Sequence, residues 1–224
     1  MRGETCGAAA LYLGDCRDIV PGLEWASAII ADPPYGLDFA ADSTRARRKV
    51  GAARKDWDAT PVPDLPAILF RADVRAVWGG NYYALPPSRG WLSWFKPDAP
   101  PSMANFELCW TNQDRNARQI SCSISQTNAE RCGHPTQKPL RVMEWCVEQL
   151  TTVRQLVVDP FAGSGTTGVA CLRLGRRYIG REIDPEYFDM ACRRLELAER
   201  QAATREADLF AAGAPAATQA GLAL

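Results

Sequence analysis

Residues 32–35, Asp32-Pro33-Pro34-Tyr35, combine a carboxylate, two prolines and an aromatic ring directly after the apolar run 27–31. The run is typical of a buried strand, so the four residues are expected at its carboxyl end, where open α/β sheets bind ligands. Two prolines fix φ and leave the carbonyls of Asp32 and Pro33 as rigid acceptors. Such acceptors beside an aromatic ring suit the exocyclic amino group of a nucleobase. A plain Pro-Pro turn with a surface tyrosine is the alternative, because short motifs often match by chance.

A glycine-containing segment follows a second apolar run, 155–158, which we interpret as the clearest buried strand of the chain. The segment comprises Asp159, Pro160, Phe161, Ala162, Gly163, Ser164, Gly165, Thr166 and Thr167, and a helix is predicted over 168–174. Glycines between a strand and a helix let the backbone approach a nucleotide and point helix N–H groups at it. Glu182 lies at the tip of the next predicted strand. Its distance in sequence from the glycines is typical of the acidic residue that binds ribose hydroxyls in dinucleotide-binding folds. A Walker loop is excluded because no Lys-Ser or Lys-Thr follows the glycines.

Two smaller groups are further ligand candidates. The hexapeptide 134–139, His-Pro-Thr-Gln-Lys-Pro, precedes an amphipathic helical pattern. Its hydroxyl, its amide and the ammonium of Lys138 suit a carboxylate or phosphate, although helix entry alone needs only the proline. Asp15 and Cys16 follow a predicted strand at 10–13, and Asp15 is either a ligand group or a helix N-cap.

Residues 36–60 contain few large apolar groups and are predicted to form a basic, mobile loop. Its cations are Arg45, Arg47, Arg48, Lys49, Arg54 and Lys55. Because the loop follows the proposed base-binding residues, it is a candidate to bind DNA phosphates and close over an extruded nucleotide. A solvated charge run without a partner is the alternative.

Composition favours one globular domain. The 224 residues are 46% hydrophobic and 23% charged, with a formal net charge of zero, so nucleic-acid contact requires a local basic patch. Eight scattered cysteines without a C-x-x-C pair, and a single histidine, argue against a metal site and favour reduced thiols in the cytoplasm. The apolar run near the start is too short for a signal sequence, and no stretch reaches the length of a membrane span.

The middle of the chain is organised by further predicted elements. A helix is predicted over 61–71, a strand over 74–78 that ends at Gly79-Gly80, a helix starting at 81–83, and aromatic-rich strands over 91–95 and 106–110. The tryptophans of these strands are interpreted as core residues. A polar connection spans 111–133, and a last helix is predicted over 184–205, with a disordered tail over 206–224.

Together these stretches resemble the DNA amino-methyltransferases, and the order of the motifs is similar to the permuted β group, especially small solitary phage or prophage enzymes. The resemblance implies an α/β, single-domain Rossmann-like S-adenosylmethionine-dependent fold over 1–205, with a mostly parallel seven-stranded sheet and helices on both faces. It implies catalysis by residues 32–35 without a metal. It assigns cofactor contacts to Asp15, Cys16, Lys138, Asp159, Pro160, Phe161, Ala162, Gly163, Gly165, Thr166, Thr167 and Glu182.

The resemblance also sets expectations for substrate and partners. Asp32 in the first motif position favours adenine N6 over cytosine N4 as the methyl acceptor in double-stranded DNA. The short segment 111–133 implies a short or relaxed recognition sequence. A bacterial cytoplasmic enzyme, compatible with a homodimer and without an obligatory companion nuclease, is expected. More distant alternatives are an RNA or protein-glutamine methyltransferase, a nicotinamide-dependent dehydrogenase and a non-catalytic DNA-binding module.

Overall fold

The computed structural model describes residues 2–18, 25–36, 60–63, 65–69 and 71–213, with side chains up to residue 205. The cations predicted to contact DNA, Arg45, Arg47, Arg48, Lys49, Arg54 and Lys55, lie outside the described residues. Among the helices that are described, none is long and apolar enough to cross a membrane.

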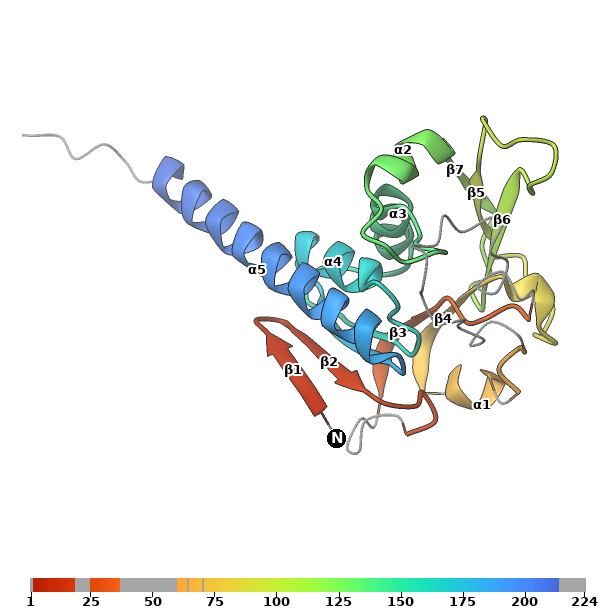
Figure 1. The fold of residues 1–224 in the computed structure, drawn as a ribbon, viewed down its shortest axis with the longest axis horizontal. Helices are drawn as coiled ribbons and strands as arrows, with labels where there is room; N and C mark the ends of the chain where they lie inside the picture. Colours follow the sequence, from red (N-terminus) through yellow and green to blue (C-terminus); the bar gives the residue numbers. More distant parts are fainter. Residues whose placement is uncertain (1, 19–24, 37–59, 64, 70, 214–224) are drawn as a thin grey trace, which may run out of the picture.

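A single twisted sheet forms the centre of the molecule (Figure 1). Its strands are β1 (Arg2–Cys6), β2 (Ala9–Leu13), β3 (Ala26–Ala31), β4 (Ala72–Trp78), β5 (Leu92–Phe95), β6 (Phe106–Thr111), β7 (Arg118–Ser121), β8 (Leu156–Asp159) and β9 (Arg177–Glu182). In the described part of the chain the order is β1-β2-β9-β8-β3-β4-β6-β5-β7. The run from β2 to β4 is parallel, whereas β1 and β6 pair antiparallel with their neighbours β2, β4 and β5.

The prediction of seven mostly parallel strands was therefore wrong in strand number, because the described sheet has nine strands and is mixed. The strands without a sequence prediction, β1 and β7, are the two edge strands, and most of their residues are exposed or only partly buried. A strand without a buried face has no period-2 apolar pattern, so its sequence does not predict it.

The helices lie on both faces of the sheet. They are α1 (Leu65–Leu69), the short 3-10 helix η1 (Gly80–Tyr82), α2 (Ile124–Ala129), α3 (Leu140–Leu150), α4 (Thr166–Arg173) and α5 (Pro185–Gly213). Figure 1 shows α3, α4 and α5 together, with the far end of α5 extending beyond the sheet. This helix continues to Gly213, past the predicted end at residue 205 and into the segment predicted as a disordered tail. The 3-10 turn η1 takes the place of the helix predicted to start at 81–83.

Side chains of successive strand residues point to opposite faces of the sheet, so each face carries its own apolar core. In β3, Ile30 belongs to the core shared with α3, α4 and α5, while Ile29 and Ala31 belong to the core shared with α1. Successive residues of a strand point to opposite faces, so a strand buried on both faces reads as one continuous apolar run. Strands β3 and β8 are parallel neighbours, which brings their carboxyl ends together. Asp32 and Asp159 consequently lie at the same edge of the sheet.

Candidate active site

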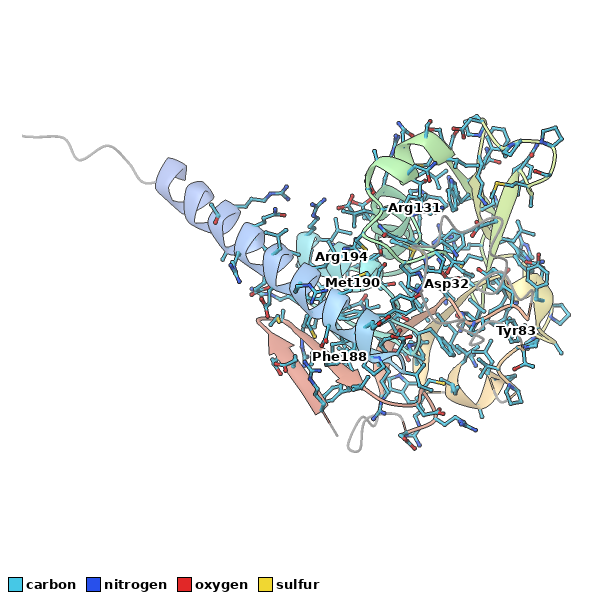
Figure 2. All side chains as sticks on the ribbon, viewed as in Figure 1. Asp32, Tyr83, Arg131, Phe188, Met190 and Arg194 are labelled. Carbon is cyan, nitrogen blue, oxygen red and sulfur yellow. The ribbon has the colours of Figure 1, made fainter. Side chains whose placement is uncertain are left out.

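One cavity of about 370 Å³ lies where the three predicted motifs meet. Its lining includes the predicted residues Asp15, Cys16, Asp32, Pro34, Lys138, Asp159, Pro160, Phe161, Ala162, Gly163, Thr166, Thr167 and Glu182. Pro33, Tyr35 and Gly165 do not line it. Figure 2 shows Asp32 near the middle of the molecule, where β3 ends. The structure thus brings together motifs that are separated by more than a hundred residues of sequence.

Asp159 ends β8 at the base of the cavity and is buried. The amide of Phe161 donates a 3.0 Å hydrogen bond to its carboxylate. Burial raises the pKa of Asp159 from 3.8 to about 7, because the charged form loses its hydration. A cation beside this carboxylate would favour its ionised form.

The loop after Asp159 turns sharply into α4. The Gly165 amide donates to the Ala162 carbonyl at 2.7 Å, and Gly165 has a φ of 74°, in the left-handed region that favours glycine. A Cβ at Gly165 would come within 2.9 Å of the Cβ of Ala191 in α5. Gly165 therefore shapes the loop from behind, which explains why it does not line the cavity.

Glu182 ends β9 on the same side of the sheet. The amides of Gly163 and Asp184 hold its carboxylate at 2.7 Å and 2.8 Å. Burial raises the pKa of Glu182, and these two amide hydrogen bonds partly oppose the rise. The carboxylate is fixed at the cavity wall by backbone dipoles.

Asp32, which also lines the cavity, is paired with an ammonium group. Lys138 Nζ lies 2.8 Å from Oδ1 and 2.7 Å from Oδ2 of Asp32, and the Tyr35 hydroxyl donates to Oδ1 at 2.7 Å. Burial disfavours the charge on Lys138, but Asp32 and Glu107 outweigh burial and raise its pKa above the ordinary lysine value. Lys138 was predicted from the family resemblance to contact the cofactor, and here its ammonium contacts the predicted catalytic carboxylate.

Glu107 and Lys96 complete this charge cluster and were not predicted. Glu107 Oε2 lies 3.0 Å from Lys138 Nζ, and its Oε1 lies 2.5 Å from Lys96 Nζ. In β6, Glu107 shares a face with the core residue Cys109. The sequence signal for Glu107 was a charged residue among the core-facing positions of an aromatic-rich strand. Its role becomes visible only from its two lysine partners.

Tyr35 and the preceding Pro34 each contact another tyrosine. Its ring stacks on Tyr82 with centroids 5.1 Å apart and an interplanar angle of 18°. The hydroxyl of Tyr83 donates a hydrogen bond to the carbonyl of Pro34. One face of Tyr35 is covered by Tyr82, and its role as a stacking platform for a base stays a prediction.

Two other predicted ligand groups have partners within the protein. Arg17 bonds the Asp15 carboxylate through Nε at 2.9 Å and lowers the pKa of Asp15 to about 2. Gln137 accepts from the amide of Cys132 at 3.0 Å and donates to the Glu130 carbonyl at 3.1 Å. Gln137 therefore braces the chain before α3, while the ligand role of Asp15 stays a prediction.

Comparison with known proteins identifies the family. A family model described as DNA methylase, for N6 and N4 methyltransferases, matches residues 72–193, which is more than half of the chain. Type II methyltransferase M2.DpnII of Streptococcus pneumoniae is 49% identical over 63 residues, which are 28% of this chain and 24% of that protein. DNA adenine methyltransferase YhdJ of Escherichia coli (strain K12) is 43% identical over 70 residues, 31% of this chain and 24% of that protein. The match thus spans about a quarter of each of these two relatives.

Solved structures share the fold. The M1.HpyAVI complex with SAM aligns with a TM-score of 0.55 and 23% identity over 84% of this chain and 98% of that one. The cytosine-N4-specific PvuII DNA methyltransferase aligns with a TM-score of 0.55 and 18% identity over 90% of this chain and 93% of that one. With the family model spanning more than half of the sequence, the chain belongs to the N6/N4 DNA methylase family.

Proposed function

We propose that this chain transfers a methyl group from S-adenosylmethionine to the exocyclic amino group of a base in double-stranded DNA. The observation that carries the proposal is the shared cavity, in which the Asp32 carboxylate and the Asp159 to Thr167 loop face one space from adjacent strand ends. An acceptor for an amine and a nucleotide-type loop that line the same cavity match the two reactants of such a transfer.

The cavity fits the cofactor in size and charge. A volume of about 370 Å³ lies within the usual range of small-molecule sites. S-adenosylmethionine carries a sulfonium and an ammonium, and it supplies an electrophilic methyl group when bound. The carboxylates of Asp159 and Glu182 accept hydrogen bonds from backbone amides, which are neutral. A cation can therefore bind them without breaking an ion pair in those bonds. Among the described residues, no cluster of three histidine, cysteine or acidic side chains is arranged to hold a metal.

Asp32 would act on the amine. An aromatic amino group is a poor nucleophile because its lone pair is delocalised into the ring. A hydrogen bond from one N–H group to the Asp32 carboxylate would help to localise that lone pair and stabilise the positive charge that develops on nitrogen. The Pro33 carbonyl, which does not line the cavity, stays a predicted acceptor for the second N–H group. The new N–C bond would replace the S–C bond to the transferred methyl group, whose electron pair would stay on the sulfur as a neutral thioether, and one N–H proton would then leave to Asp32 or to water.

We favour adenine N6 as the acceptor. The motif resemblance and the name of YhdJ, a DNA adenine methyltransferase, support adenine, whereas the PvuII enzyme is cytosine-N4-specific. Segment 111–133, which here contains β7 and α2, is our candidate for a short or relaxed recognition element. The phosphate contacts of the segment 36–60, a homodimer and independence from a companion nuclease stay predictions.

Nucleoside mass spectrometry tests the proposal. The full chain is incubated with plasmid DNA and S-adenosylmethionine carrying a deuterated methyl group, and the DNA is digested to nucleosides. We expect labelled N6-methyladenine, and labelled N4-methylcytosine would move the acceptor to the alternative base. Unlabelled DNA, with label found instead on RNA or on a glutamine-containing protein offered in parallel, would contradict the proposal.

A further inference from the structure

Lys138 occupies the position that the proposed function assigns to the target amine. Its ammonium lies within 2.8 Å of both Asp32 carboxylate oxygens. Asp32 Oδ1 also accepts the hydroxyl of Tyr35. A base amine can bind Asp32 only if the lysine ammonium moves away.

A second acceptor for that ammonium is already in contact. Glu107 Oε2 lies 3.0 Å from Lys138 Nζ, on a different strand from Asp32. The ammonium also lies 5.4 Å from the ring centroid of the fully buried Trp78. A short rotation of the lysine tip would leave it on Glu107 and over Trp78, so it would not become a buried charge without a partner.

Lys96 makes Glu107 suitable for this role. Asp32, Lys138, Glu107 and Lys96 form an alternating row of two carboxylates and two ammonium groups with no net charge. Burial alone would raise the pKa of Glu107, but Lys138 and Lys96 outweigh burial and lower it. Glu107 therefore stays ionised and keeps an acceptor ready for Lys138.

We propose that Glu107 is a positioning residue that retains the Lys138 ammonium when the amino group of the target base displaces it from Asp32. This inference rests on the proposed function. The exchange frees the Asp32 carboxylate as an unneutralised anion at the moment when the amine nitrogen gains positive charge. It also explains why strand β6, outside the recognised motifs, carries a partly buried glutamate.

The kinetic test is a double-mutant cycle on the full chain. Glu107→Gln keeps the shape but removes the charge, so Lys138 should stay on Asp32. We expect single-turnover methylation of plasmid DNA to fall by about 100-fold, with the dissociation constant for S-adenosylmethionine within about twofold of the unchanged protein. Adding Lys138→Met removes the competing ammonium and should restore at least about tenfold over Glu107→Gln alone.

Glu144→Gln is the matched control, because Glu144 pairs with Arg173 at 3.3 Å in the contact between α3 and α4 and should leave transfer unchanged. Transfer by Glu107→Gln equal to that of the unchanged protein overturns the inference. A double variant slower than Glu107→Gln also overturns it, because a merely structural role predicts accumulating damage.

A spectroscopic readout separates this inference from the proposed function. The side-chain ammonium signal of Lys138, assigned with Lys138→Met in lysine-labelled protein, is followed by NMR during titration with millimolar adenosine. A shift that occurs in the unchanged chain and is absent in Glu107→Gln supports the inference, even if no DNA is methylated and the proposed function fails. No shift in a chain that also fails to methylate overturns it.

Discussion

The carboxylates of the site form two groups, the Asp159 end (Asp159 and Glu182) and the Asp32 end (Asp32 and Glu107), which are held by different means. At the Asp159 end, backbone amides bond the carboxylates of Asp159 and Glu182, and burial raises the pKa of both. At the Asp32 end, Asp32 and Glu107 are paired with the ammonium group of Lys138. Amide dipoles compensate a buried carboxylate only in part, whereas an ammonium neutralises it. In the proposed reaction, the Asp159 end would accept a cationic ligand directly, whereas the Asp32 end would have to exchange partners before a neutral amine binds.

The largest effect should come from Asp32→Ala. Removing the carboxylate removes the acceptor for the amine, so we expect label transfer to DNA to fall by about 10³-fold or more. Cofactor affinity, measured by isothermal titration calorimetry, should change little because the Asp159 end is untouched. Asp32→Asn, which keeps the shape and one acceptor, should be intermediate, and undiminished turnover in Asp32→Ala would refute the assigned role.

The pH dependence of cofactor affinity tests the role of Asp159. Its pKa is about 7 in the free protein, and a bound cation favours the ionised carboxylate. The affinity for S-adenosylmethionine should therefore fall as the pH drops below 7, by up to about tenfold per pH unit. Calorimetry between pH 5.5 and 8.5, roughly one to two pH units on either side of that pKa, measures this.

Asp159→Asn is the matched variant. It should bind the cofactor about 10- to 100-fold more weakly at pH 8 and lose most of the pH dependence. Because the folded pKa of Asp159 lies above its unfolded value, ionisation costs stability as the pH rises from 3.8 through about 7. The cofactor-free Asn variant should thus be more stable than the unchanged protein above pH 7 in urea unfolding. If the cofactor affinity of this variant kept the pH dependence of the unchanged protein, the proposal that Asp159 binds the cationic cofactor would be contradicted.

A substitution at Gly79 tests whether the packing around Tyr35 supports Asp32. It has a φ of 67°, and a Cβ there would come within 2.1 Å of the Tyr35 ring. Gly79→Ala should lower the free energy of unfolding by about 2 to 4 kcal/mol and slow methyl transfer, since Tyr35 bonds Asp32.

Gly175→Ala is the control for backbone strain. Gly175 also has a positive φ, of 71°, but the nearest atom to its Cβ would be 3.5 Å away, in Val153. It should cost about 1 kcal/mol of stability and leave transfer unchanged. Equal effects of the two variants on transfer would show that Tyr35 is not braced by Gly79.

A small effect on stability should come from Tyr82. Its ring stacks on Tyr35, but the residue is 47% exposed. Tyr82→Ala should lower the free energy of unfolding by about 0.5 to 1.5 kcal/mol, and Tyr82→Phe, which keeps the ring, should lower it by less. Chemical denaturation measures both, and equal losses would assign the effect to the hydroxyl instead of the stacking.

The motifs, and most of the strands and helices that carry them, could be predicted from local patterns in the sequence. The apolar runs before Asp32 and Asp159 predicted β3 and β8, because a strand buried on both faces leaves a continuous local pattern. The glycines and the Asp-Pro after these runs mark where the chain turns toward a ligand. Local periodicity and turn chemistry are short-range properties, so a linear pattern carries them.

The pairing of the charged side chains could not be predicted from the sequence and depends on the folded arrangement of the strands. Lys138 contacts Asp32 across 106 positions of sequence, and Glu107 and Lys96 join them from strand β6 and from the end of β5. Edge strands β1 and β7 were not predicted either, because their exposed residues leave no apolar period. Pairing between distant residues depends on strand order and register, and neither property is encoded in any one segment.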